Sequence, residues 1–172
     1  QSSFEFSDKL TTQVGLRLPY HSLYSANLIP SIYFKYDFNK NNQIRLSYSK
    51  GFRSPTIKEL FMEFIDINHN IIGNSELKPE KSDAFQMSLA LLPKYNDKIY
   101  WSVNIEGFLN LLNNKIELAR LQSSDVYTYY NLTKSTYYGT NTFIKFNIKS
   151  KMNTLSSFNL MWNMFLIKND SF

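Results

Sequence analysis

Few residues in this sequence of 172 could carry out acid–base, nucleophilic or metal chemistry. There is no cysteine, and the only histidines are His21 and His69. Disulfides, thiolate metal sites and cysteine nucleophiles are therefore excluded, and imidazole chemistry is limited to two positions. No serine, histidine and acid combination, and no acidic pair, recurs on segments that would face each other. The sequence therefore predicts a protein that is not an enzyme and has no cofactor of its own.

Side chains suited to binding gather between residues 52 and 82. Arg53 and Lys58 can donate hydrogen bonds to carboxylate or phosphate groups of a ligand. Phe61 belongs to a set of aromatic and aliphatic residues that give apolar area to a stretch expected to face water. His69 adds a neutral imidazole, a natural ligand of iron. We predict these four as ligand-binding residues. The competing interpretations are that the first three only shape and pack the loop and that His69 is an ordinary exposed histidine.

Strands must position these residues, because hydrophobicity alternates with a period of two along most of the chain. About eight segments alternate in this way, although 99–114 is too long for an ordinary strand. The segments predicted as strands are 4–6 (partial), 10–20, 28–38, 43–51, 85–91, 99–114, 136–149 and 154–165.

The connections between these strands alternate in length. Short polar turns are expected at 7–9, 39–42, 93–98 and 150–153, and longer connections at 21–27, 52–82 and 115–134. Transmembrane β-barrels have this arrangement, with tight turns at one rim and long loops at the other. A soluble sandwich or a lipocalin-like barrel also alternates apolar and polar residues, and it is the competing fold.

The predicted architecture is an antiparallel up-and-down meander with one apolar and one polar face. Aromatic residues lie near the strand ends, as in the interfacial girdles of membrane barrels. No apolar run is long enough for a membrane helix. The net charge is +5, but the basic residues are scattered singly, so nucleic acid is not a predicted partner. The apolar face should carry Leu16, Phe34, Leu46, Leu89 and Ile105, and the polar face Arg17, Lys35, Arg45, Ser88 and Glu106.

Two boxes in the 52–82 segment carry a resemblance to TonB-dependent outer-membrane receptors. The first reads Phe-Arg-Ser-Pro at 52–55, followed by Ile-Lys-Glu-Leu-Phe at 57–61, where Thr56 and Glu59 predict a helix cap. The second reads Gly-Asn-Ser-Glu-Leu-Lys-Pro-Glu at 73–80. The sequence departs from the family pattern at Ser54, Ser75 and Glu76. The residues that match it are Phe52, Arg53, Pro55, Gly73, Asn74, Leu77, Pro79 and Glu80.

The resemblance implies a fold and a place in the cell. The fold is all-β, a transmembrane antiparallel up-and-down β-barrel, of which residues 1–172 would form a slice of about eight strands out of about 22. The whole chain would then belong to one barrel domain, with the plug domain and the other strands outside it. The first and last strands should pair with protein beyond these residues, because lipid cannot satisfy open strand edges. The expected location is the bacterial outer membrane.

The resemblance also implies a function. Such receptors bind a scarce, bulky ligand outside the cell, such as an iron–siderophore, haem or cobalamin, and import it with energy delivered through TonB. The expected partners are the TonB complex, contacted through the missing plug region, outer-membrane lipid and the ligand. Haem receptors of this family place an axial histidine between the same two boxes, so His69 is a candidate ligand of haem iron. A passive porin-like channel and a soluble all-β ligand-binding module are the alternatives.

Overall fold

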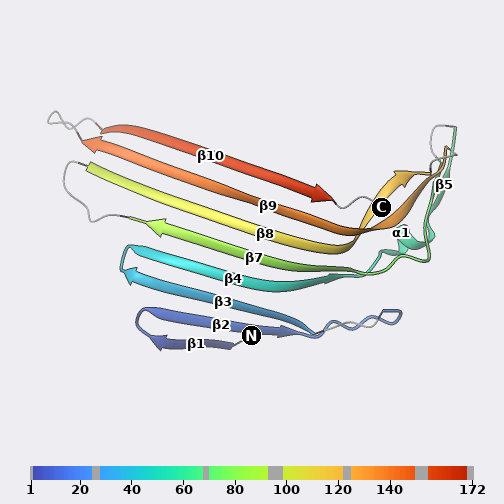
Figure 1. Ribbon diagram of the computed structural model, residues 1–172, viewed down its shortest axis with the longest axis horizontal. Coiled ribbons are helices and arrows are strands. Elements are labelled where there is room, and N and C mark those ends of the chain that lie inside the picture. Colours follow the sequence, from blue (N-terminus) through green and yellow to red (C-terminus); the bar gives the residue numbers. More distant parts are fainter. Residues whose placement is uncertain are drawn as a thin grey trace.

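The computed structural model describes residues 2–24, 28–67, 70–92, 99–121, 125–149 and 155–169. This part of the chain forms one sheet of ten strands and one five-residue helix (Figure 1). No helix within it is both long and apolar enough to cross a bilayer. The elements are β1 Ser2–Ser7, β2 Leu10–Arg17, β3 Ile29–Asn39, β4 Asn42–Arg53, α1 Ile57–Phe61, β5 Glu63–Ile65, β6 Asn70–Ile72, β7 Glu80–Leu91, β8 Ile99–Arg120, β9 Tyr127–Lys149 and β10 Leu155–Asn169.

The eight longer strands form the predicted up-and-down meander. They lie in the order β1-β2-β3-β4-β7-β8-β9-β10, and each pairs antiparallel with the next. The β1–β2 and β3–β4 turns lie at one end of the sheet, whereas α1 and β5 lie at the other (Figure 1). The predicted two-ended architecture is therefore confirmed where the structure describes it. The turns expected at 93–98 and 150–153 lie outside the described residues.

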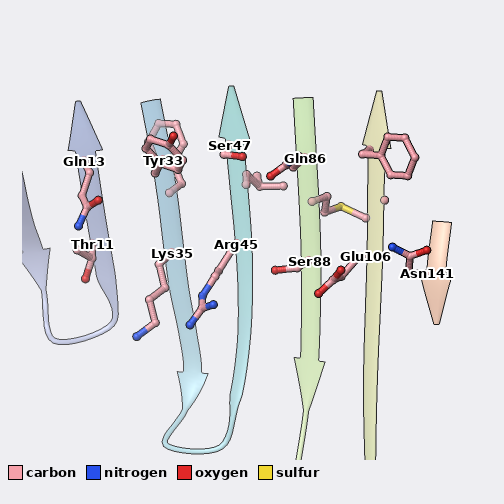
Figure 2. Close-up of a pocket in the computed structure, with 15 residues that line it drawn as sticks. Thr11, Gln13, Tyr33, Lys35, Arg45, Ser47, Gln86, Ser88, Glu106 and Asn141 are labelled. Carbon is pink, nitrogen blue, oxygen red and sulfur yellow. The ribbon is translucent and has the colours of Figure 1, made fainter. Parts of the chain in front are cut away.

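The register confirms the two predicted faces. Directly opposite residues of paired strands share a face. Phe34 lies opposite Leu46, and Leu89 lies opposite Ile105, on the apolar face. The opposite face carries an unbroken line of polar partners across six strands: Thr11, Lys35, Arg45, Ser88, Glu106 and Asn141 (Figure 2).

The connection predicted at 115–134 is wrong. Strands β8 and β9, which are 22 and 23 residues long, extend into this segment and pair as far as Arg120 opposite Tyr127. Beyond Asn114, which has φ 55°, the apolar residues of β8 no longer follow the phase of the wall. Ile116 instead packs against Leu60 and Leu77 of the connection after β4. The outer part of the strand therefore resembles a loop in the sequence.

The other long connections also differ in their bounds. Strand β2 ends at Arg17 rather than at residue 20, so the first connection begins earlier than predicted. The connection after β4 runs over 54–79 and contains α1, β5 and β6. The short strand β6 pairs parallel with the start of β9, where Ile71 lies opposite Tyr127. This 54–79 connection, called the long loop below, joins β4 to β7 and is also attached to β9 through β6.

The buried aliphatic side chains lie at one end of the molecule. Among the described aliphatic and aromatic residues, four are buried: Leu60, Leu77, Ile116 and Leu132. Wall residues such as Leu16 and Phe158 are 63% and 62% exposed. The described sheet is a single layer, and its apolar face has no covering layer of protein. One layer of antiparallel strands with an uncovered apolar face has the form of part of a barrel wall and not of a two-layered sandwich.

Candidate functional site

Arg53 joins the two boxes at the base of the long loop. It lies directly opposite Glu80 in the β4–β7 register. Its Nε and Nη2 donate to the two carboxylate oxygens of Glu80, both at 2.7 Å, and its Nη1 donates to Glu59 at 3.0 and 3.1 Å. A bidentate arginine–carboxylate pair is among the stronger polar contacts in proteins. The last residue of β4, the first of β7 and the helix between them are thus held by one guanidinium.

Helix α1 begins with the predicted cap. The Glu59 backbone N–H donates to the Thr56 hydroxyl at 3.2 Å, and the Thr56 N–H donates to the Glu59 carboxylate at 2.7 Å. This reciprocal pair satisfies two helix-end donors. Partial burial alone would raise the pKa of the Glu59 carboxyl, but the hydrogen bonds from Thr56 and Arg53 outweigh it and hold this pKa below its usual value. Glu59 therefore stays ionised and keeps both its cap and its ion pair at neutral pH.

The second box packs against the end of this helix. A Cβ at Gly73 would lie 2.7 Å from backbone atoms of Leu60, Phe61 and Met62, so only glycine fits there without displacing the backbone. The Gly73 N–H donates to the Met62 carbonyl at 2.6 Å. The Asn74 N–H donates to the Glu59 carbonyl at 2.9 Å. The close approach of the two boxes explains why one begins with glycine.

Strand β9 supplies contacts that the sequence did not reveal. The Asn74 side chain donates to the Tyr129 carbonyl at 2.8 Å. Asn131 accepts from the Lys78 N–H at 2.8 Å and donates to the carbonyls of Lys78 and Asn114 at 2.9 and 2.8 Å. Asn131 lies in the segment predicted as a connection, and its contacts with the second box depend on the extended β8–β9 pairing. Its amide fastens the second box to the wall.

A small apolar cluster lies under these polar contacts. Leu60 of α1, Leu77 of the second box and Ile116 of β8 are 6%, 3% and 8% exposed, and Tyr129 packs against them. The Ile116 N–H donates to the Glu80 carboxylate at 2.7 Å, which links the cluster to the ion pairs. We call Arg53, Glu59, Glu80, Asn74, Asn131 and this cluster the loop base. Of the other residues that match the family boxes, Pro55 is buried, Pro79 is half-buried just before β7, and Phe52 lies opposite Lys81.

The structure brings together only some of the predicted binding residues. Arg53 belongs to the loop base, and its side chain keeps 42% exposure. Lys58 and Phe61 are exposed on α1, five and eight residues along the chain from Arg53. His69 lies outside the described residues. The ligand roles of all four remain predictions.

The long loop presents apolar side chains to its surroundings. Ile57 and Phe61 on α1 are 80% and 64% exposed, and Ile65 and Ile67 in and after β5 are 59% and fully exposed. Such a group of exposed apolar residues is typical of a binding surface. The anchored base and the exposed outer part make the long loop a candidate capture element.

The polar face of the wall is a second candidate surface, and a cavity lies along it (Figure 2). Lys35 forms an ion pair with Asp37 at 2.8 Å. Arg45 donates to Gln43 at 3.4 Å, and Asn104 donates to Glu106 at 3.1 Å. Each of these three contacts joins residues two positions apart on one strand, so the groups remain available to a polar occupant.

Aromatic rings stand on the same face nearer the loop end. The ring centroids of Phe108 and Phe165 are 6.0 Å apart, and those of Tyr137 and Phe165 are 6.1 Å apart. Gly139 lies between Phe108 and Phe165 in the register, and a Cβ there would meet the Phe108 ring at 2.9 Å. Phe108 therefore lies on the polar face, and its ring packs over Gly139. No three histidine or acidic side chains in the described part of the chain are grouped to hold a metal ion.

Comparisons with known proteins agree with this geometry. Residues 1–169 match the family described as TonB dependent receptor-like, beta-barrel. The "Probable hemoglobin and hemoglobin-haptoglobin-binding protein 4" of Haemophilus influenzae is 31% identical over 84 residues, which cover 49% of this chain and 8% of that protein.

Solved receptor structures share the fold. The siderophore receptor PirA from Pseudomonas aeruginosa superposes with a TM-score of 0.69 and 18% identity over 95% of this chain and 30% of PirA. The ferric enterobactin receptor PfeA of the same species superposes with a TM-score of 0.67 and 16% identity over 94% of this chain and 26% of PfeA. The Serratia marcescens hemophore receptor HasR superposes with a TM-score of 0.59 and 13% identity over 93% of this chain and 32% of HasR. This chain therefore spans about a third or less of each relative.

Proposed function

Because this chain belongs to the TonB-dependent receptor family, within its β-barrel, we propose that it provides part of the wall and one extracellular loop of an active importer. Barrels of this family are outer-membrane proteins, and we assign the same location to this one. The imported ligand would be scarce and bulky, and the energy would reach the receptor through the TonB complex. The plug that contacts TonB and the rest of the barrel would come from protein outside residues 1–172.

An iron-bearing ligand is the proposed cargo, either a ferric siderophore or haem. The relatives named above bind siderophores, haem with its carrier protein, or haemoglobin. His69 supports haem, since a histidine imidazole is a common axial ligand of haem iron. Cobalamin is the third ligand class that such a receptor could take.

The loop base is the observation that carries the proposal. Arg53, Glu59 and Glu80 fix both ends of the long loop, while Asn74 and Asn131 attach its second box to β9. The outer part of the loop then projects exposed apolar residues from an anchored platform. A passive channel needs no such anchored loop, and a soluble module would cover the apolar face of its sheet. These features favour a ligand-capturing receptor over both alternatives.

The test uses the full-length receptor that contains this chain, purified in detergent. Deletion of residues 66–72 should impair capture of haem or of a ferric siderophore, while the barrel still assembles because the loop base is untouched. Assembly is measured by the heat-dependent mobility of the barrel on denaturing gels. Normal ligand affinity after this deletion would reject the capture role of the loop.

A second variant separates the two cargo classes. His69→Ala should weaken haem binding and the accompanying absorbance shift if the imidazole ligates iron. The same variant should leave siderophore uptake nearly unchanged if the cargo is a siderophore. His21→Ala is the matched control, because His21 lies in another connection and should have no effect on either ligand.

A further inference from the structure

The apolar face of the wall changes character sharply near its loop end. One row of directly opposite residues on this face is aromatic or aliphatic across five strands: Tyr48, Phe85, Leu109, Tyr138 and Leu166. One and two positions further toward the loops, the same face carries lysines. These are Lys50, Lys81, Lys134 and Lys168, which we call the lysine collar.

The collar is a patch of uncompensated positive charge. All four lysines are exposed. Among the described residues, none of the four has an ion-pair partner. The acidic residue within these rows is Asp83, which lies opposite Lys50 and accepts a hydrogen bond from the Tyr48 hydroxyl at 2.7 Å. These two rows therefore carry four ammonium groups, on β4, β7, β9 and β10, and one carboxylate.

The height of the collar matches the edge of a hydrocarbon layer. On β8 the apolar face runs from Ile99 to Leu111. Twelve residue steps at about 3.3 Å each, in a strand tilted by about 40°, rise about 30 Å, which is about the thickness of the hydrocarbon core of a bilayer. The collar begins where this band ends. Lysine stems can lie along the apolar band while their ammonium groups reach the headgroups.

We propose that the lysine collar binds phosphate groups of the lipid in the outer leaflet of the membrane. Charge complementarity carries this assignment, because the collar offers cations on the lipid-facing side at headgroup depth. A cargo ligand would instead meet the loop or the polar face. The proposal rests on the outer-membrane location proposed above, but it concerns a different surface of the wall and does not depend on the cargo.

The decisive experiment measures binding of lipid A with two phosphates to the full-length receptor in detergent micelles by native mass spectrometry. The quadruple variant Lys50→Gln, Lys81→Gln, Lys134→Gln, Lys168→Gln should bind this lipid at least tenfold more weakly, since one lysine near an anionic surface is worth about fivefold in affinity. The four Lys→Arg changes should retain binding. The pair Lys9→Gln, Lys40→Gln, two exposed lysines in the turns at the other end, should bind like the wild type.

A variant that should bind lipid A more tightly provides a second test, because misfolding of the receptor cannot explain a gain in affinity. Asp83→Asn removes the carboxylate from the collar rows while keeping an acceptor for Tyr48, so lipid A should bind several-fold more tightly. Wild-type affinity in the quadruple glutamine variant would overturn the proposal, and so would an equal loss in the Lys9 and Lys40 control. Complete displacement of lipid A by free pyrophosphate would also overturn it, by showing a site for soluble phosphate.

The same samples separate this proposal from the proposed function. Cargo affinity should be unchanged in the quadruple glutamine variant, because the collar faces away from the loop and the polar face. Loss of lipid binding with intact cargo capture is the expected result. A receptor that binds lipid A through the collar but captures neither haem nor siderophore would contradict the proposed cargo and leave the collar assignment standing.

Discussion

The wall and the loop base are built on different physical terms. The wall is one layer of strands whose apolar residues face outward and remain exposed in the protein alone, so its side chains need only be apolar and in register. The loop base is a compact unit in which one arginine, two glutamates, two asparagines and three buried aliphatic residues have specific partners. Many sequences can meet the first requirement, and few can meet the second. The boxes that resemble the receptor family therefore lie in the loop base and not in the wall.

Truncation of a buried side chain in the loop base should give the largest effect. Leu77→Ala removes a side chain that is 3% exposed and leaves a cavity against Leu60 and Ile116. We expect the long loop to lose about 2–4 kcal/mol of stability against local opening. Hydrogen exchange of residues 54–79 in the full-length receptor measures this loss. Met87→Ala on the apolar face of the wall is the control, and equal loss of loop protection in both variants would contradict the contrast between the two regions.

Removal of the guanidinium should come next. Arg53→Ala leaves the Glu59 and Glu80 carboxylates close together with no cation between them. We expect a loss of about 1–3 kcal/mol in loop protection, less than for a fully buried pair because Arg53 is partly exposed. Arg53→Lys should recover only part of it, because an ammonium cannot make the bidentate contact. Arg45→Ala on the polar face is the matched control, since its described partner is the neutral Gln43 at 3.4 Å.

Acid should weaken the loop base through Glu59. Its pKa is lower in the folded loop than its ordinary value of 4.5, so its ionised form stabilises the fold. The stabilisation is complete above the ordinary value and is lost as pH falls through the lower, folded value. Loop protection, corrected for intrinsic exchange rates, should therefore decline below about pH 4.5. Glu59→Gln should remove the part of this decline that depends on Glu59, and an unchanged acid profile in that variant would contradict the assignment.

The same contrast explains what the sequence could predict. The wall follows from period-two alternation, and the pairings of Phe34 with Leu46 and Lys35 with Arg45 confirm the predicted faces. The cap of α1 was also predictable, because Thr56 and Glu59 have the spacing of a capping box. The outer parts of β8 and β9 were not, because Ile116 and Tyr129 pack against the long loop and leave the alternation of the wall.

The site was predictable only in part. The boxes identified Arg53 and Glu80, but their mutual pairing depends on the β4–β7 register. The roles of Asn131 and Tyr129 depend on the extended β8–β9 hairpin, which the alternation of residues 115–134 did not predict.

The smallest effect is expected for a residue next to the buried cluster that does not belong to it. Leu60 and Phe61 are neighbours on α1, but Leu60 is 6% exposed and Phe61 is 64% exposed. Phe61→Ala should change loop protection by less than about 0.5 kcal/mol, because most of its apolar surface already faces outward. Leu60→Ala should cost about 2–4 kcal/mol, as for Leu77.

Cargo affinity should instead be sensitive to Phe61 if the exposed face of α1 contacts the ligand. Phe61→Ala would then weaken capture without opening the loop. A Phe61→Ala receptor with normal protection and normal affinity would remove Phe61 from the binding surface, and a variant with lost protection would place it in the loop base instead.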